Sequence, residues 1–515
     1  MTAPRAVLPV LRRHWLFIAI FTAGTALRLI TALAYRPVLI FYDSPSYIGN
    51  AVRLTPTGFR PIGYPLFLAP LLRLNNLVVI PILQHLLALA AAVLLYRTLV
   101  RIGLWPWLAA VGTSAFLLDG FQLNLEQWVM SDTLFETLLV IAFCALLWNH
   151  RPGWGAALIC GTALALAVSV RFVGVFLIVP AIAYCLIACP DWKRRAQRTL
   201  AICAAFVLPI AGYATWFTVS NDRFGLSGSS GVLLYARAAS FVDCSSIELP
   251  DYEKPLCPVE PLGHRATTNS YAWGGNSPAA GYTPPAGMDK DKVLNDFAKR
   301  VILQQPIDFL RTVGGDFLHG FQWGRHNRSV DIKRDYWVFR DTYPDWEDGP
   351  DPARTTALYG GGPPTVQRGL ATFLHFYQRI AYTNGPFLAL ALVIALAAGC
   401  GLGRARRSGI RTVALLWAVA GATVTLFAYA ASEFTWRYQM PLVIFYPIAG
   451  AVGLFALLGG RRAVPAPPPP SHAGAAIKTS PDVPVCCAGC RPPTPPRPNP
   501  PRPIEDRSSS RPPVY

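Results

Sequence analysis

Charged residues are scarce in this chain of 515 residues. Asp, Glu, Lys and Arg make up 14% of it, whereas a soluble domain has roughly 25%. Hydrophobic residues make up 53%, and they gather in stretches of about 18 to 22, which is long enough to cross a hydrocarbon core roughly 30 Å thick. This composition excludes an ordinary soluble protein and predicts an all-α polytopic membrane protein with about ten transmembrane helices.

Acidic residues are scarcer than basic ones, and the net charge is +18. The basic residues do not form a nucleic-acid-binding patch, because they stand between the apolar stretches at alternate ends, as in cytoplasmic loops. The lipid bilayer is therefore the expected partner, and nucleic acid is not. The apolar run after Arg12 and Arg13 is long and lacks a clear small-residue cleavage site, so no cleaved signal peptide is expected.

Ten spans are predicted, and the basic residues between them set their orientation. The spans are residues 14–34, 77–97, 104–122, 131–149, 153–170, 172–189, 199–219, 384–403, 412–431 and 440–459. The basic residues at alternate ends of the spans are Arg5, Arg12, Arg13, Arg97, Arg101, Arg151, Lys193, Arg194, Arg195, Arg198, Arg404, Arg406, Arg407, Arg411, Arg461 and Arg462. All fall on one side, which predicts a multi-pass protein of the plasma (inner) membrane with both termini in the cytoplasm.

The segments between the spans suggest four parts. Residues 1–219 form a membrane module whose first external loop, 35–76, is polar and turn-rich. Residues 220–380 are large enough for an external soluble domain, expected to be α/β or mixed, with an amphipathic helix near 289–303. Residues 381–462 hold the last membrane helices. Residues 463–515 contain 17 prolines and predict a disordered cytoplasmic tail, either merely solvated or bound by a proline-recognition partner.

The cysteines do not have the spacing of a metal site. Six lie in predicted spans: Cys144, Cys160, Cys185, Cys189, Cys203 and Cys400. Three in the tail, Cys486, Cys487 and Cys490, lack the second pair or the histidines of a zinc site. Cys244 and Cys257 are the two cysteines of the external segment. An oxidising compartment predicts a disulfide between them, and two free buried thiols are the alternative.

Asp43 is the only acidic residue among the first 118. A carboxylate so close to a membrane boundary suits a general base, or a group that binds a metal ion or lies beside a phosphate. The alternative is structural, since Asp before Ser44-Pro45 is a frequent N-cap of a helix. One residue could serve both purposes.

Several short motifs share the predicted external face. They are Tyr42-Asp43-Ser44-Pro45-Ser46-Tyr47, Arg60-Pro61-Ile62-Gly63-Tyr64-Pro65, Ser131-Asp132, Arg171 before Phe172-Val173-Gly174, and Trp436-Arg437-Tyr438-Gln439-Met440-Pro441. In this order they resemble the membrane glycosyltransferases of the GT-C fold, in the branch of lipid A aminoarabinose transferases and protein O-mannosyltransferases. The likeness covers residues 14–220 well and the last spans loosely.

The resemblance implies a glycosyltransferase that moves a sugar from a polyprenyl-phosphate donor to an extracytoplasmic acceptor, with inversion at the anomeric carbon as in the family. Asp43 or Asp132 would be the base. The candidates that bind the donor phosphate are Arg60, Arg171 and Arg437, because guanidinium presents paired donors to phosphate oxygens. Tyr47, Tyr64 and Trp436 are candidates for stacking on a sugar. The resemblance does not fix a cofactor, and a divalent metal ion is left open.

One departure and several alternatives accompany this interpretation. The family commonly has a second acid where this chain has Ser44, and Asp132, Glu126 or Asp119 could replace it. Arg60 could be merely interfacial, Arg437 could pair with Glu433 along a helix, and His85 beside Gln84 is expected to be a satisfied buried pair. The competing functions are a flippase or transporter of lipid-linked sugars and an inactive cell-envelope scaffold.

Overall fold

The computed structural model describes residues 4–56, 60–226, 228, 230–346 and 349–461. The proline-rich tail, with its three cysteines and its proposed partner site, lies outside the described residues. The described residues form one compact unit.

Every predicted span contains a helix. In chain order these are α1 Pro4–Ala34, α4 Val79–Arg101, α5 Pro106–Leu118, α7 Asp132–Leu147, α8 Trp154–Val170, the η1 Phe172–Leu177 and α9 Ile178–Ala188 pair, α10 Trp192–Asn221, α17 Gly385–Gly399, α18 Arg411–Ala431 and α19 Met440–Leu457. Among the described helices five are long and apolar enough to cross a membrane, and a sixth span arises if the bent pair α16–α17 counts as one. The shorter apolar helices include α5, α8 and η1–α9. The chain is thus a mostly helical, polytopic membrane protein, and the number ten stays a prediction.

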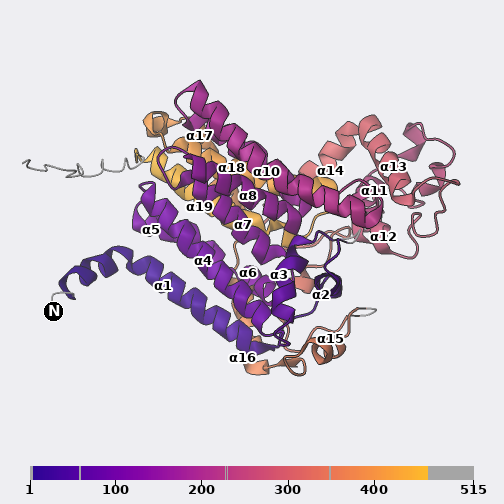
Figure 1. Cartoon of the computed structure of the whole chain (residues 1–515), viewed down its shortest axis with the longest axis horizontal. Helices are drawn as coiled ribbons and strands as arrows, with labels where there is room; N and C mark the ends of the chain where they lie inside the picture. The colour runs from indigo at the N-terminus through magenta and orange to yellow at the C-terminus, as the bar shows by residue number, and fades with distance from the viewer. Residues whose placement is uncertain (1–3, 57–59, 227, 229, 347–348, 462–515) are drawn as a thin grey trace, which may run out of the picture. The chain divides into compact units, whose positions relative to one another are not determined.

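Small residues allow the apolar helices to pack closely. Figure 1 shows α7, α8 and α10 beside α17, α18 and α19. A Cβ at Gly161 of α8 would lie 2.5 Å from the carbonyl oxygen of Ile202 in α10. Gly450 and Gly453 of α19 face α17 in the same way, with its Ala391 and Ala395 within 3 Å of an added Cβ. Because lipid tails are as apolar as the helix side chains, the hydrophobic effect hardly drives helix association in a membrane. Close backbone approach of this kind supplies van der Waals packing energy instead.

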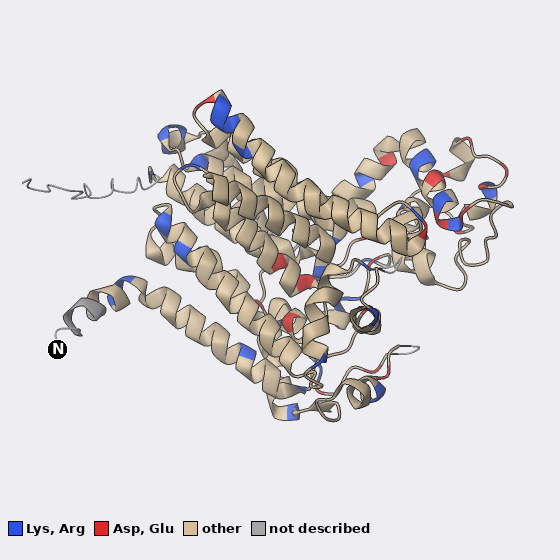
Figure 2. Ribbon diagram, in the orientation of Figure 1, with Lys and Arg blue, Asp and Glu red and all other residues tan. Residues whose placement is uncertain are grey.

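The basic segments that predicted the orientation lie together in space. Figure 2 shows Lys and Arg at the end of the helical bundle where α4 ends, α10 begins and η5 (Gly403–Arg407) lies. Three short helices lie toward the opposite end of the bundle in Figure 1: α2 Ser44–Arg53, α3 Gly63–Leu72 and α6 Gly120–Gln127. All eight residues of α6 are buried.

The segment 220–380 is helical, so the expected α/β or mixed domain is wrong for its described residues. It contains α11 Ser230–Ala239, η2 Cys244–Ser246, η3 Lys254–Leu256, α12 Thr268–Trp273, α13 Lys290–Gln304, α14 Pro306–His319, η4 Arg334–Trp337, α15 Pro352–Tyr359 and α16 Arg368–Ile380. Its one strand, β2 Thr365–Val366, pairs antiparallel with β1 Tyr35–Arg36. Proline stands in the first turn of η3, α14 and α15, and glycine ends α12, α14 and α15, so these residues bound short helices here. The predicted amphipathic helix at 289–303 corresponds to α13.

A lobe within this segment has a hydrophobic core of its own. Tyr235 and Ala239 of α11 pack with Phe297 and Val301 of α13. A disulfide joins Cys244 to Cys257, the pair predicted from the sequence. The lobe contacts the membrane helices through α11 and α14, which both pack against α18.

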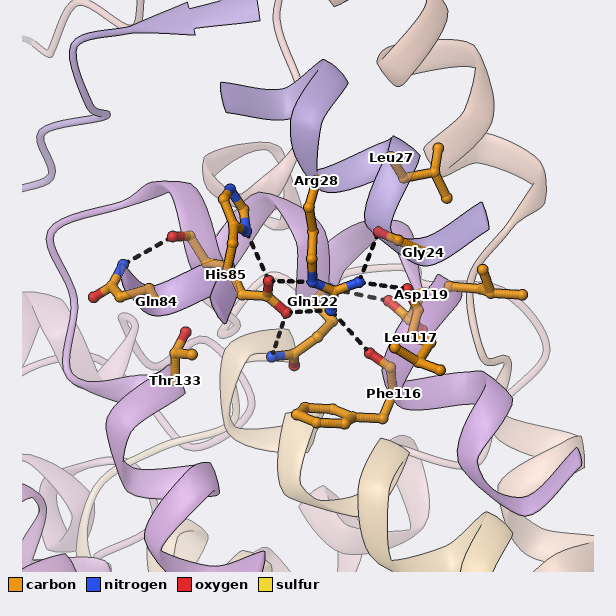
Figure 3. Close-up of polar contacts among 12 residues, drawn as sticks. Gly24, Leu27, Arg28, Gln84, His85, Phe116, Leu117, Asp119, Gln122 and Thr133 are labelled. Atoms are coloured by element: carbon orange, nitrogen blue, oxygen red, sulfur yellow. Dashed lines mark hydrogen bonds and ion pairs between the residues drawn. The ribbon is translucent and has the colours of Figure 1, made fainter. Parts of the chain in front are cut away.

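A buried charged network fixes α6 against α1 and α4. Arg28 of α1 donates hydrogen bonds of 2.8 and 2.7 Å to the two carboxylate oxygens of Glu126 and also binds the carbonyls of Gly24 and Leu117. His85 of α4 contacts the same carboxylate at 2.8 Å. Figure 3 shows these side chains converging between the helices. A buried charge without a partner would cost several kcal/mol, so the network holds α6, and the segment that follows it, in one position.

Candidate functional site

Five charged residues from distant parts of the chain form one cluster. They are Asp43 just before α2, Arg60 just before α3, Asp132 at the start of α7, Arg171 at the end of α8 and Arg437 in η6 (Trp436–Gln439). Ion pairs link them in the order Arg60, Asp43, Arg437, Asp132, Arg171. All five were candidates from the sequence. We refer to them below as the charged cluster.

Asp43 stands at the N-cap position of α2, but its side chain makes no capping hydrogen bond. One carboxylate oxygen instead pairs with Arg60, and the other accepts a hydrogen bond of 3.2 Å from Nη1 of Arg437. The structural alternative for Asp43 therefore does not hold, because its carboxylate faces the cluster. Burial by itself lowers the pKa of Arg60, but the negative charge of Asp43 opposes it, and that pKa is raised above its usual value.

Asp132 has far more contacts than Asp43. Nε of Arg437 lies 3.0 Å from both of its carboxylate oxygens, and Nη2 lies 2.8 Å from Oδ2. Arg171 pairs with Oδ1. The side chain of Asp132 is 4% exposed, whereas that of Asp43 is 12% exposed. Asp132 thus orients the guanidinium groups of Arg437 and Arg171, and Asp43 is the more accessible of the two acids.

The cluster has a net positive charge, with three guanidinium groups against two carboxylates. Such a group of preorganised donors suits an anionic ligand that bears several oxygens, such as a phosphate. It does not suit a divalent metal ion, because arginine nitrogens already bind the carboxylate oxygens that would be its ligands. Within the described part of the chain, no group of three or more His, Cys, Asp and Glu residues could hold a metal.

Backbone and side-chain hydrogen bonds fix the loop that carries Asp43. The amide of Leu39 donates to the carbonyl of Gln127, and the amide of Val129 donates to the carbonyl of Leu39. The hydroxyl of Ser44 accepts from the amide of Phe41 and donates to the carbonyl of Val129. Ser44, which stands where the resemblance predicts a second acid, therefore joins the loop to the segment that leads into Asp132.

The aromatic residues that were candidates for stacking on a sugar are buried. Tyr47, Tyr64 and Trp436 are each at most 2% exposed. The hydroxyl of Tyr47 contacts that of Ser131 at 3.1 Å, and Tyr64 donates to Gln84. Rings so enclosed present no open face on which a sugar could stack. Tyr47 instead supports Arg60, whose guanidinium carbon lies 5.7 Å from the centre of the Tyr47 ring.

The structure distinguishes among the acids that could compensate for Ser44. Only Asp132 shares a partner, Arg437, with Asp43. Glu126 belongs to the buried network with Arg28, and Asp119 accepts backbone hydrogen bonds at the start of α6.

The structure also tests the structural roles considered for Arg437 and His85. The helical pairing of Arg437 with Glu433 does not form, because α18 ends at Ala431 and η6 begins only at Trp436. His85 and Gln84 are satisfied, as expected, by contacts to Glu126, Gln127 and the carbonyl of Trp128.

Two features of this region were not recognised from the sequence. Glu136 lies one turn after Asp132 and accepts a hydrogen bond from Gln122, and its spacing of four residues from Asp132 was the available signal. Arg325, buried beside Trp436, lines a cavity that is described below. No motif marked it, since its neighbours come from three separate parts of the chain.

Comparison with known proteins agrees with part of this picture. Residues 73–224 match the family described as dolichyl-phosphate-mannose-protein mannosyltransferase. The predicted resemblance is confirmed there. This segment runs from the end of α3 to just beyond α10 and includes Asp132 and Arg171, whereas Asp43, Arg60 and Arg437 lie outside it.

Other matches are more distant. The structure of the S. cerevisiae protein O-mannosyltransferase Pmt1-Pmt2 complex bound to the sugar donor is similar at 17% identity and a TM-score of 0.34. The alignment covers 45% of this chain and 37% of that one. A search of curated proteins gives no match.

Proposed function

We propose that this chain is a membrane glycosyltransferase that uses a polyprenyl-phosphate sugar as its donor. The observation that supports this most strongly is the charged cluster, in which three arginines and two acids from five segments meet beside the apolar helices. A lipid-linked donor has an anionic phosphate at the membrane boundary, and an excess of guanidinium is the chemistry that recognises it. The family match over residues 73–224 supports the same class of reaction.

In this mechanism Asp43 is the general base. It accepts the proton of the acceptor hydroxyl as the hydroxyl oxygen attacks the anomeric carbon of the sugar. The bond between that carbon and the phosphate oxygen breaks, and the polyprenyl phosphate leaves with the electron pair. A single displacement of this kind inverts the configuration at the anomeric carbon. The greater exposure of Asp43 among the two acids favours it for direct contact with the acceptor.

Arg60 and Arg437 then stabilise the charge that develops on the departing phosphate. Both bind Asp43 in the free protein, so the donor phosphate would compete with that carboxylate for their N–H groups and release it to act as the base. Preorganised donors of this kind commonly supply the largest share of a rate enhancement. Arg171, which pairs with Asp132, adds a third positive charge to the cluster.

Asp132 has a positioning role in this proposal. Its contacts with Arg437 and Arg171 hold both guanidinium groups in a fixed orientation. We therefore revise the expectation that either acid could be the base and assign that role to Asp43.

The proposed reaction occurs on the extracytoplasmic face. The helices α2 and α3, which follow Asp43 and Arg60, lie away from the basic ends of α4 and α10 (Figures 1 and 2), and the positive-inside rule assigns those basic ends to the cytoplasm. The acceptor is then a glycan, lipid or protein of the cell envelope.

The test is a transfer assay with purified protein in nanodiscs. Polyprenyl-phosphate mannose and polyprenyl-phosphate arabinose, each radiolabelled in the sugar, are incubated with a cell-envelope extract. Transfer of label from the lipid phase to the acceptor fraction, dependent on Asp43, is expected. If the protein instead moves intact labelled donor across a sealed bilayer without transfer, it is a flippase. If it does neither, the scaffold alternative replaces both.

A further inference from the structure

A cavity of about 820 Å³ lies next to the charged cluster. Its walls come from α6, from residues 323–342 and from α16 with the turn that follows it. Trp436 and Trp337 separate it from Arg437: Arg325 of the cavity contacts the Trp436 ring, and the guanidinium of Arg437 lies over the Trp337 ring.

Arg325 is the unusual residue of this cavity. Its side chain is 3% exposed, yet Nε, Nη1 and Nη2 have no hydrogen-bond partner among the described residues. A buried guanidinium is normally paired, because a polar group buried without a partner costs free energy that the fold must supply elsewhere. Burial accordingly lowers the pKa of Arg325, and the charge of Asp119 partly opposes that shift.

Asp119 does not satisfy Arg325. The closest approach between Nη2 and the carboxylate is 4.0 Å, at the limit of an ion pair. Oδ1 of Asp119 already accepts hydrogen bonds from the amides of Phe121 and Gln122, and Oδ2 accepts one from the amide of Thr383. With both oxygens committed to the backbone, Asp119 leaves the buried N–H groups of Arg325 without a hydrogen bond.

The remaining walls are also basic and partly aromatic. Arg334, Arg340 and Arg379 line the cavity with Arg325, against the two acids Asp335 and Asp341. The guanidinium of Arg325 lies 3.8 Å from the centre of the Phe121 ring, and the exposed ring of Trp323 lines the cavity as well. Arginine and aromatic faces together suit a flat polar ring that carries an anionic group. The volume is also far larger than a single phosphate or carboxylate requires.

We propose that this cavity is a binding site for an acidic saccharide, a sugar whose phosphate or carboxylate group accepts hydrogen bonds from Arg325. The bound oxyanion replaces the missing partners of Nε, Nη1 and Nη2, and the sugar lies against Trp323. The proximity of the cavity to the charged cluster makes this saccharide part of the acceptor, a role that rests on the proposed function. The binding of the saccharide itself does not depend on the proposed function.

An anionic lipid head group offers the same chemistry from another source. The helix α16, which supplies one wall, has exposed apolar residues at Phe373, Phe376 and Ile380, so lipid could approach it. The experiment therefore needs a lipid arm as well as a saccharide arm.

The probe is mannose 6-phosphate, titrated by calorimetry into the full chain in phosphatidylcholine nanodiscs, with mannose and glucuronate in parallel. Saturable binding of the two acidic sugars, and at least tenfold weaker binding of mannose, is expected. Arg325→Gln should weaken binding of the acidic sugars at least tenfold. The matched control is Arg311→Gln, since Arg311 is an exposed arginine of α14 outside the cavity, and it should bind as the wild type does.

Thermal unfolding without ligand separates this role from a structural one. Removing a buried, unsatisfied charge should leave Arg325→Gln at least as stable as the wild type, and mannose 6-phosphate should stabilise only the wild type. A strong loss of stability in Arg325→Gln, or binding that the substitution does not affect, would overturn the proposal. So would a tenfold loss of wild-type sugar binding when phosphatidylglycerol replaces phosphatidylcholine, because the ligand would then be a lipid head group. Binding without any sugar transfer in the assay above would refute the proposed function alone.

Discussion

Arg437 binds Asp132 through a forked contact, although the two residues are 305 positions apart in the chain. Nε and Nη2 of the guanidinium face the carboxylate, and Nη1 remains for Asp43. This single side chain connects the first loop, the start of α7 and the turn before α19. The contact is buried, so its geometry is set by the surrounding helices and not by solvent.

Replacing Arg437 by lysine should separate the contribution of its positive charge to turnover from that of its forked contact. Lysine keeps the positive charge but has one nitrogen, so it cannot bind Asp132 in a fork and reach Asp43 at the same time. We expect a fall in turnover of about 100-fold to 1,000-fold, the scale for losing a preorganised donor, with the protein still folded. A single-turnover assay on the purified variant measures it. Arg311→Lys on the exposed face of α14 is the control, and near-normal turnover in Arg437→Lys would show that the fork is dispensable.

Glu433 should make stability depend on pH. It lies between α18 and η6, where burial raises its pKa to about 8, with Arg237 opposing the shift. The folded protein therefore holds a proton that the unfolded chain, with an ordinary pKa of 4.5, has lost at neutral pH. Its stabilising contribution is full below about pH 4.5 and is lost as the pH rises toward 8.

Thermal unfolding of the protein in nanodiscs between pH 5 and pH 8.5 tests this expectation. Glu433→Gln cannot ionise, so its unfolding temperature should fall less with rising pH than that of the wild type. Glu248→Gln, at an exposed position, should behave as the wild type does. Identical slopes for Glu433→Gln and the wild type would rule out a protonated Glu433.

The proposed orientation can be tested with a membrane-impermeant thiol reagent on intact cells. His264 is exposed in the segment 220–380, and a cysteine introduced there should be labelled. The native Cys486, Cys487 and Cys490 should be labelled only after permeabilisation. Labelling of the tail cysteines in intact cells would reverse the assigned orientation.

The sequence predicted the helical framework and the charged cluster because both depend on local signals. Apolar stretches and the basic residues at one end of each located helices such as α4 and α10. Asp43, Arg60 and Arg437 were found because each stands in a short polar motif beside an apolar stretch. Their common external face followed from the order of the spans, although no sequence signal indicated that Arg437 would contact both acids.

The parts that could not be predicted depend on tertiary contacts. Arg28 and Glu126 lie within or beside apolar stretches, and only the packing of α1 against α6 pairs them. Arg325 stands in a segment rich in turns, where an arginine ordinarily indicates a solvated surface. The α/β expectation for 220–380 failed because composition alone does not distinguish short helices joined by Gly and Pro from short strands joined by turns.

The most direct test of the proposed mechanism is the turnover of Asp43→Asn. Asparagine has nearly the same size but cannot accept the proton, so turnover should fall by about two to four orders of magnitude. Asp351→Asn is the matched control, since Asp351 is an N-cap whose side chain binds the amides of Ala353 and Arg354, and it should retain activity. Asp132→Asn should also lose activity, accompanied by lower stability because Arg437 and Arg171 lose a buried partner. Near-normal turnover of folded Asp43→Asn, with activity abolished in an equally stable Asp132→Asn, would contradict the assignment of Asp43 as the base.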